Sequence, residues 1–137
     1  MDELIKNIWN TMDKKEVVKR LKELNLPKDE YYVLSGASLV LRGIREQCSD
    51  IDLCISEELF EKIKNKLKMT SDKLNERGFY HLSDSLEIVV DKKSRFNMEE
   101  GEEFNYEDIN TILAFKKSRN LSKDQRDIAN IEKYLNK

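Results

Sequence analysis

Proline and glycine are scarce in this chain of 137 residues, which contains one proline and four glycines. This scarcity argues against a loop-rich all-β fold and against a disordered chain of low complexity. Histidine and cysteine are also rare, and His81 with Cys48 and Cys54 cannot form a closed zinc site without a carboxylate. We expect both cysteines to be reduced thiols, as is usual in cytoplasmic proteins.

Long apolar runs and an excess of charge of one sign are missing as well. No stretch approaches the roughly 18 apolar residues of a membrane-spanning helix, and the N-terminus lacks the basic start and apolar run of a signal peptide. The 27 acidic and 25 basic residues leave a net charge of −2, whereas nonspecific nucleic-acid binders are usually strongly basic. These absences predict a cytoplasmic protein that makes no membrane contact.

The residues that are present suit one domain with a modest core, since 39% are apolar and 38% are charged. We expect this single domain to span 1–137 without a linker. Helices are expected within 1–26, a sheet core that carries the functional motif within 31–91, and C-terminal helices within 105–136. The first of these regions has two apolar stripes at helical spacing, the first at Leu4, Ile5, Ile8 and Trp9 and the second at Val17, Val18, Leu21 and Leu24.

Short β-branched runs predict strands at 31–34, 50–55 and 86–91, and the last of these is expected to pair with 79–82. The expected order is helix, strand, helix, strand, helix, strand, helix and helix. Such an order predicts an α/β (α+β) fold in which a small mixed sheet is covered by helices.

Cap and turn signals set the expected helix boundaries. Residues 35–36 are expected to form a tight turn before a short helix at 37–41 that Gly43 ends, and 92–103 to form a loop. The expected N-terminal caps of the three later helices are Ser56, Asn105 and Ser122.

The most informative residues are Asp50 and Asp52, which are separated by one apolar residue. Side chains alternate faces along a strand, so both carboxylates should share one face while Ile51, Leu53 and Ile55 point into the core. Two neighbouring carboxylates repel each other and stay ionised together when a cation sits between them. Magnesium suits such a pair, because it accepts one or two carboxylates together with phosphate oxygens and water. The pair therefore predicts a Mg²⁺ site.

Ser35, Gly36 and Ser38 lie between an expected strand and an expected helix. Such a turn leaves backbone N–H groups and the positive helix end free to hold phosphate. Gly36 would allow close approach of the backbone, and the two serine hydroxyls would donate hydrogen bonds. The alternative is a plain strand-to-helix turn, in which glycine and serine are common.

Glu87 lies on the third expected strand among apolar residues that point the other way. If that strand is next to the second, Glu87 joins the face that carries Asp50 and Asp52. A third carboxylate there would complete a two-metal site or act as general base for an acceptor hydroxyl. Asp91, on the same face four residues further on, is the alternative third acid.

Residues 34–45 and 49–53 together resemble the signature of the DNA polymerase beta-like nucleotidyltransferase superfamily. That signature is a strand, a glycine-glycine or glycine-serine turn, a helix and an acidic–apolar–acidic strand, followed by a third acid that Glu87 matches. Small stand-alone bacterial members are the most similar, and some of these modify antibiotics or belong to toxin–antitoxin pairs. The C-terminal segments 114–117 and 123–128 are similar to theirs. Ser35 departs from the pattern by standing at the place of the first glycine.

The resemblance implies transfer of a nucleoside monophosphate from a nucleoside triphosphate (NTP) to an acceptor hydroxyl, with release of pyrophosphate. It implies that Asp50 and Asp52 hold Mg²⁺ on the triphosphate and that Glu87 binds a second metal ion or takes the proton of the acceptor. The phosphate contacts that we assign with it are Ser35, Gly36, Ser38, Arg45 and Lys116. We expect no catalytic role for Asp124, Arg126 and Asp127, which pair with one another or hold the last helix in place.

The sequence leaves two other functions open. A catalytically silent protein of the same fold would act as a binding partner, such as an antitoxin or an assembly subunit. A helical interaction protein without this fold would contain almost no strand. The acceptor of an active enzyme would be a small molecule, a protein side chain or an RNA end, and the small size of the chain favours a site completed by a homodimer or a partner protein.

Overall fold

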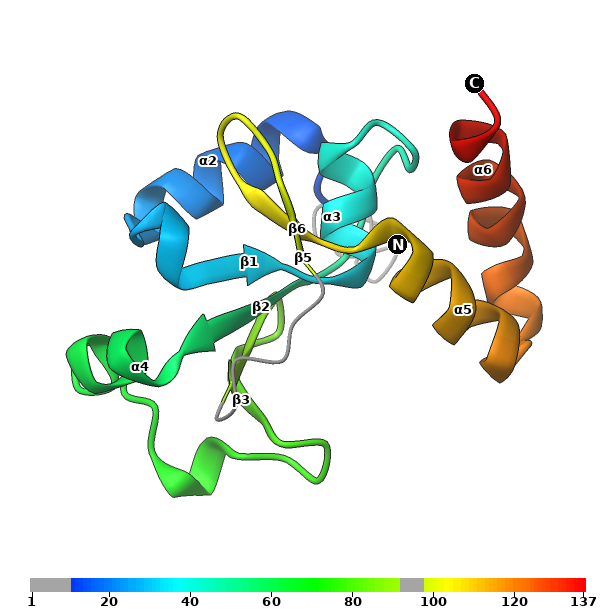
Figure 1. Ribbon diagram of the computed structural model, residues 1–137. Coiled ribbons are helices and arrows are strands. Elements are labelled where there is room, and N and C mark those ends of the chain that lie inside the picture. The colour runs from blue at the N-terminus through cyan, green and yellow to red at the C-terminus, as the bar shows by residue number, and fades with distance from the viewer. Residues whose placement is uncertain (1–10, 92–97) are drawn as a thin grey trace, which may run out of the picture.

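The computed structural model describes residues 11–91 and 98–137, and Figure 1 shows a mixed sheet flanked by helices. The sheet has six strands in the order β3-β4-β2-β1-β6-β5. Strands β4 and β2 are parallel, as are β1 and β6, and the other neighbours are antiparallel. In chain order the strands are β1 (Tyr31–Val33), β2 (Ile51–Ser56), β3 (Phe79–Ser83), β4 (Leu86–Asp91), β5 (Met98–Glu100) and β6 (Asn105–Glu107).

The described α-helices are short, and three of them begin at residues whose side chains cap the helix. Asp13 and Ser56 accept hydrogen bonds from the backbone N–H groups of Glu16 and Leu59, at 2.9 and 3.0 Å. None of the helices in the described ranges combines the length and apolar character needed to cross a membrane. The α-helices are α2 (Lys14–Leu24), α3 (Ser35–Leu41), α4 (Glu57–Ile63), α5 (Ile109–Arg119) and α6 (Gln125–Leu135), and short 3₁₀ turns occur at Lys28–Glu30, Ser71–Lys73 and Ser122–Asp124.

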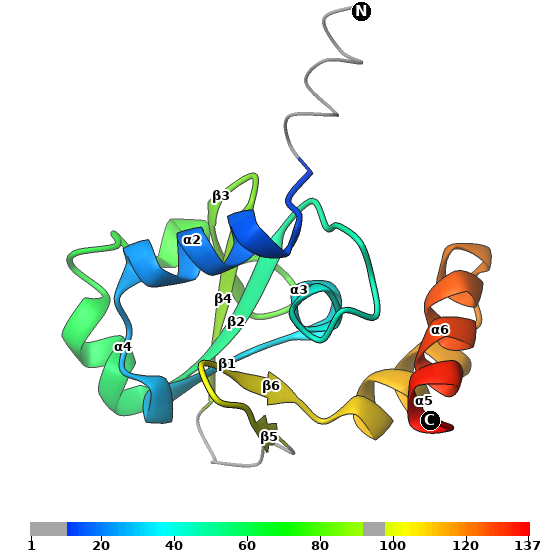
Figure 2. The ribbon, with the colours of Figure 1, turned by 90° about the horizontal axis from the view of Figure 1, so that it is seen from above.

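One apolar core joins the strands to α2, α3 and α4. Ile51, Leu53 and Ile55 are buried in it, as the alternation along β2 predicts. A second, smaller cluster joins Leu39 of α3 to α5 and α6. Residues 37–41 of α3 are therefore all buried, as expected for a helix enclosed between two cores. Figures 1 and 2 place α5 and α6 side by side, away from α2 and α4.

The predicted mixed sheet covered by helices is confirmed, and a purely helical fold is wrong. Two predictions near the C-terminal half are also wrong. Part of the expected 92–103 loop forms β5, and Asn105 starts β6 instead of capping a helix. The Asn105 side chain is buried and its Nδ2 donates to the carbonyl of Lys28 at 3.1 Å, while Asp108 caps α5. These strands are three residues long, which is too short for an alternation pattern to be recognised.

Smaller differences concern helix ends. Helix α3 begins at Ser35, where a separate turn was expected, and Gly43 follows its end with a φ of 79°, as a terminating glycine should. Ser122 forms a 3₁₀ turn and makes no capping hydrogen bond for α6. The expected first stripe, at Leu4, Ile5, Ile8 and Trp9, and positions 92–97 lie outside the described residues.

Buried ion pairs fasten α6 to α5. The Lys116 side chain is 6% exposed, and its Nζ lies 3.5 Å from Asp124 and 3.3 Å from Asp127. Arg119 also binds Asp124 and holds the pKa of that carboxyl at about 2. Lys116 thus occupies an inward position of α5, while its neighbour Phe115 is 55% exposed. Asp124 and Asp127 hold the last helix in place, as expected, through basic residues outside α6 and not by pairing with one another. Arg126, which was expected to share this role, is exposed and has no ion pair among the described residues.

Replacing Lys116 with alanine should destabilise the protein, because two neighbouring carboxylates would lose their shared cation inside the fold. We expect the free energy of unfolding in urea to fall by about 3 kcal/mol. Lys117→Ala is the matched control, since Lys117 is about half exposed and lies 3.7 Å from Glu132, and it should change stability by less than about 0.5 kcal/mol. Equal effects of the two substitutions would contradict the structural role of Lys116.

Candidate metal and phosphate site

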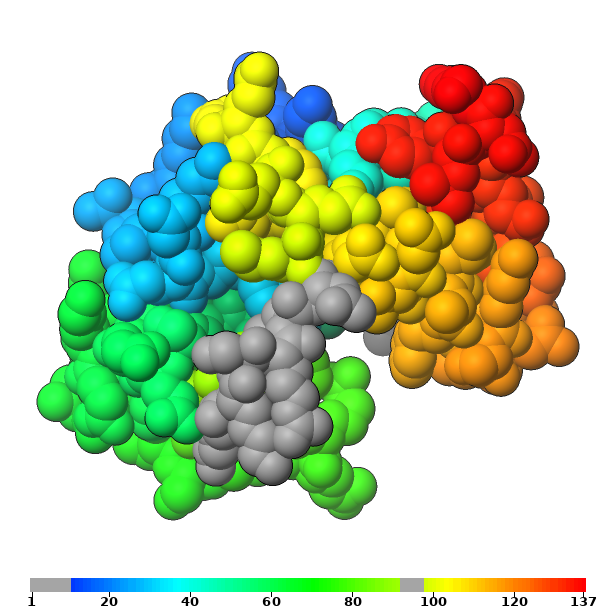
Figure 3. Space-filling view, viewed as in Figure 1, coloured from blue at the N-terminus to red at the C-terminus, as the bar shows by residue number. Residues whose placement is uncertain are grey.

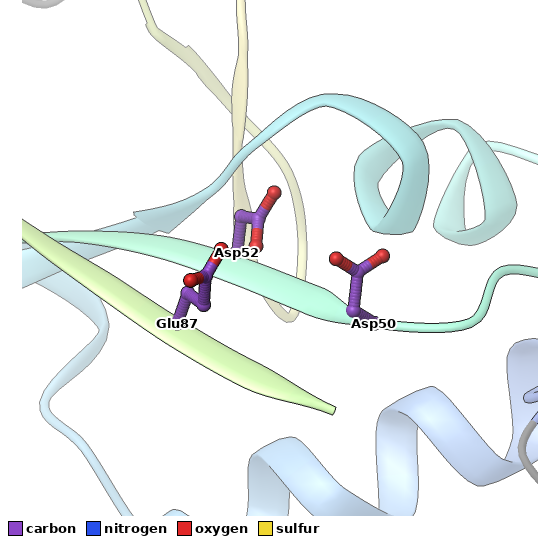
Figure 4. A group of neighbouring side chains, drawn as sticks. All are labelled: Asp50, Asp52 and Glu87. Atoms are coloured by element: carbon purple, nitrogen blue, oxygen red, sulfur yellow. The ribbon is translucent and has the colours of Figure 1, made fainter. Parts of the chain in front are cut away.

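Strand β2 presents Asp50 and Asp52 on one side, with Asp50 in the position just before the strand. Figure 4 shows both carboxylates, together with that of Glu87, projecting from the same side of β2 and β4. Asp50 is exposed and Asp52 is partly buried. The expected shared face of the two aspartates is therefore confirmed.

The register of two parallel strands brings the third carboxylate to this face. Asp52 of β2 stands opposite Glu87 of β4, and each of Asp50, Asp52 and Glu87 offers an oxygen within 4.8 Å of the others. Asp91 stands opposite Ser56, at the far end of the same strand pair. Of the two alternatives for the third acid, the structure places Glu87 at the cluster and Asp91 away from it.

Crowding of carboxylates and burial both act on Asp52. They raise the pKa of its carboxyl from 3.8 to about 6, first through loss of hydration and then through the charges of Asp50 and Glu87. Its Oδ1 atom is buried and has no hydrogen-bond partner within the described residues. A buried carboxylate oxygen without a donor is costly, and a cation among the three acids would relieve both the repulsion and the missing contact.

Three residues that the sequence analysis did not assign to this site hold Glu87 in place. Arg77 donates to Oε1 at 2.8 Å, and Asn75 donates to Oε2 at 3.0 Å. The Nδ1 atom of His81 lies 3.1 Å from the same Oε2 atom. His81 was within reach of prediction, because pairing of 79–82 with 86–91 sets it beside Glu87. Arg77 and Asn75 precede β3 and carry no comparable signal.

The predicted phosphate turn is occupied by a carboxylate of the protein itself. The backbone N–H of Ser35 donates to Oε1 of Glu107 at 2.8 Å, and the Ser38 hydroxyl donates to the carbonyl of Ser35 at 2.6 Å. Ser35 has a φ of 38°, in the left-handed region that favours glycine. Ser35 therefore adopts a backbone form that glycine adopts more readily than serine. Glu107 is the last residue of the unforeseen strand β6, which explains why the sequence analysis did not identify it.

Arg45 and Lys116, the two predicted cationic contacts, meet at one carboxylate. Arg45 Nη1 lies 3.4 Å and Lys116 Nζ 3.3 Å from Asp127 Oδ2. Arg45 also reaches the turn, because a Cβ added to Gly36 would lie 3.0 Å from its Nη1 atom. Gly36 thus leaves the space that this guanidinium fills. Lys116 is buried, and its ammonium group binds Asp127 and so joins α5 to α6 in this structure.

Comparison with protein-family models, curated proteins and solved structures gave no match to this chain. The resemblance of residues 34–53 to the nucleotidyltransferase superfamily therefore stays a prediction from the motif.

The donor set suits a hard divalent cation. Three carboxylates converge, one of their oxygens is buried without a donor, and oxygen-only ligands of this kind match Mg²⁺ or Mn²⁺. Cys48 is a buried free thiol whose pKa is raised to about 11 by burial, so it supplies no thiolate nearby. The residues present therefore fit the expected magnesium ion.

Replacing Asp52 with asparagine should stabilise the metal-free protein above pH 6. In the unfolded chain this carboxyl ionises near 3.8, whereas in the fold it ionises near 6. Well below pH 4 the carboxyl is protonated in both the folded and the unfolded state, so it costs the fold no stability. Above pH 6 it is ionised in both states, and the folded protein bears the full free-energy cost of the charge at this site. We expect the free energy of unfolding in EDTA to rise by about 2 kcal/mol at pH 7.5 and to change little at pH 4.

The control for this change is Asp84→Asn, because the Asp84 side chain is fully exposed. It should leave stability within about 0.5 kcal/mol at both pH values. A loss of stability on replacing Asp52 at pH 7.5 would show that the three carboxylates do not strain the fold.

Proposed function

We propose that the protein is a Mg²⁺-dependent nucleotidyltransferase that transfers a nucleoside monophosphate from an NTP to an acceptor hydroxyl. The observation that carries the proposal is the convergence of Asp50, Asp52 and Glu87 on one sheet face. The Ser35–Gly36 turn is next to this face, because the N–H of Leu34, just before the turn, donates to the Asp52 carbonyl at 2.9 Å. Two free cysteines and the lack of a membrane-crossing helix in the described ranges agree with a cytoplasmic setting.

The proposed reaction exchanges a phosphoanhydride bond of the NTP for a phosphoester bond to the acceptor. The acceptor oxygen bonds to the α-phosphorus, the bond from that phosphorus to the bridging oxygen of the β-phosphate breaks, and pyrophosphate leaves. A bound Mg²⁺ ion would neutralise the triphosphate and polarise the reacting phosphoryl group. Asp50 and Asp52 would hold it, and Glu87 would complete the set or receive the hydroxyl proton.

Phosphate binding is assigned to the turn and to the cations next to it. The Ser35 N–H and the Ser38 hydroxyl would donate to phosphate after leaving their present partners, the Glu107 carboxylate and the Ser35 carbonyl. Gly36 leaves the space that the Arg45 guanidinium fills. Arg45 stands beside Gly36, where a guanidinium would stabilise charge on the leaving phosphates. Lys116 supports this region through Asp127. The acceptor is a small molecule, a protein or an RNA, and a second subunit or partner protein would supply the remaining wall of its site.

Asp50→Asn should abolish transfer and leave the fold intact, because Asp50 is exposed and precedes its strand. Labelled NTPs and candidate acceptors incubated with Mg²⁺ should release pyrophosphate, and the variant should lose at least about a hundredfold of this rate. EDTA should stop the wild-type reaction, whereas Asp84→Asn should retain full activity. Survival of turnover in Asp50→Asn would overturn the assigned metal site.

A second candidate function is supported by the internal contacts of the site. Glu107 occupies the Ser35 N–H, and both oxygens of Glu87 already receive hydrogen bonds. A protein that keeps these internal hydrogen bonds would bind no NTP. It would be a catalytically silent member of the fold that acts through contacts with other proteins. Such a protein would show no affinity for a non-hydrolysable NTP in the presence of Mg²⁺.

Glu107→Gln distinguishes the two functions. In an enzyme, the triphosphate must displace this carboxylate from the Ser35 N–H, so a neutral amide should tighten NTP binding about fivefold. Calorimetric titration with a non-hydrolysable NTP and Mg²⁺ measures the change. Glu103→Gln, an exposed residue, should have no effect. If neither the wild type nor Glu107→Gln binds the nucleotide, the silent function holds.

A further inference from the structure

A groove separate from the three carboxylates runs between the segment 42–47 and one face of α6. Its volume is about 730 Å³. In Figures 1 and 3 the red end of α6 lies next to the cyan segment that includes the end of α3. The proposed transfer reaction leaves most of this groove unused.

Positive charge is concentrated in this groove although the whole chain has a net charge of −2. Its acidic lining residues are Glu46 and Asp127, and Asp127 is already paired with Arg45 and Lys116. Its basic lining residues are Arg42, Arg45, Lys123, Arg126, Lys133 and Lys137. The Arg42 side chain is buried and paired with Glu99, and Arg45 is paired with Asp127, so the positive charge of the groove comes from the four C-terminal residues of this set.

The basic residues of the C-terminal segment follow one helix face. Arg126, Lys133 and Lys137 line the groove with Asn130 between them, whereas Ile131 is buried on the other side of α6. Lys123, Arg126 and Lys133 are exposed, and none of them has a carboxylate partner among the described residues. Like charges on one helix face repel each other, so this face favours an anion.

The spread of the charges identifies the kind of anion. Arg126 and Lys133 are separated by about 10 Å along the helix axis at 1.5 Å per residue, which exceeds the reach of one phosphate group. Tyr134, 40% exposed, lies in the same groove and offers a ring on which a base can stack. We propose that the groove binds the phosphate backbone of a single-stranded polynucleotide.

Arg45 connects this groove with the carboxylate site. It lines the groove, and its Nη1 atom fills the space beside Gly36. A strand bound along α6 and in contact with Arg45 would therefore lie near the turn that is assigned to the triphosphate. The role of this polynucleotide as the hydroxyl acceptor rests on the proposed function, whereas its binding in the groove does not.

Binding is measured by fluorescence anisotropy with labelled 20-nucleotide single strands of RNA and of DNA in EDTA, where no transfer takes place. The triple variant Lys123→Glu/Arg126→Glu/Lys133→Glu should weaken binding about tenfold or more. The negative slope of log affinity against log salt concentration should become shallower by about 2, as expected for three lost phosphate contacts. Whichever of the RNA and DNA strands binds more tightly shows whether the groove prefers ribose or deoxyribose.

The matched control is Lys14→Glu/Lys15→Glu/Lys19→Glu, which makes the same charge change at exposed positions of α2 outside the groove. Circular dichroism and thermal unfolding verify that both triple variants fold. Equal weakening by the two variants, or no binding by the wild type, would overturn the proposal. Equally tight binding of polyglutamate with the same number of charges would assign the groove to acidic polypeptides instead. Asp50→Asn should bind the strands like the wild type, so loss of transfer and loss of groove binding are separate results.

Discussion

The candidate site depends on the parallel pairing of β2 with β4. Six residue pairs are in register along these strands, and one of them sets Asp52 against Glu87. A slip of one residue would turn Glu87 to the apolar face and separate the three acids. The opposite side of the same pairing buries Ile51, Leu53 and Ile88. The apolar core thus holds together three carboxylates that repel one another.

The second organising feature is the position of α3 between two cores. One side of this short helix packs on the sheet and Leu39 packs on α5 and α6. The same region carries the ion pairs that join Arg45 and Lys116 to Asp127. The C-terminal helices are therefore linked to the turn that the proposed function assigns to phosphate. This link also forms one wall of the basic groove.

Long apolar patterns were predictable, and short elements were not. The strands near 50–55 and 86–91, their buried faces and the Ser56 cap followed from alternation and cap chemistry. The strands β5 and β6 are three residues long, and their pairing depends on distant β1. Local sequence carries little information on such pairing, and Glu107 was missed for that reason. Arg77 and Asn75 reach Glu87 from an irregular segment, which sequence periodicity does not describe.

The sequence by itself determined the mixed α/β character and the shared face of Asp50 and Asp52, because side-chain alternation is a local property of a strand. Tertiary structure decided what depends on neighbours in space. Strand register brings Glu87, and not Asp91, to the two aspartates. Folding also brings the Glu107 carboxylate to the Ser35 N–H and buries Lys116 between Asp124 and Asp127. It also collected basic residues from two segments into one groove of a nearly neutral chain. These outcomes required packing, since only packing brings residues far apart in the chain within reach of one another.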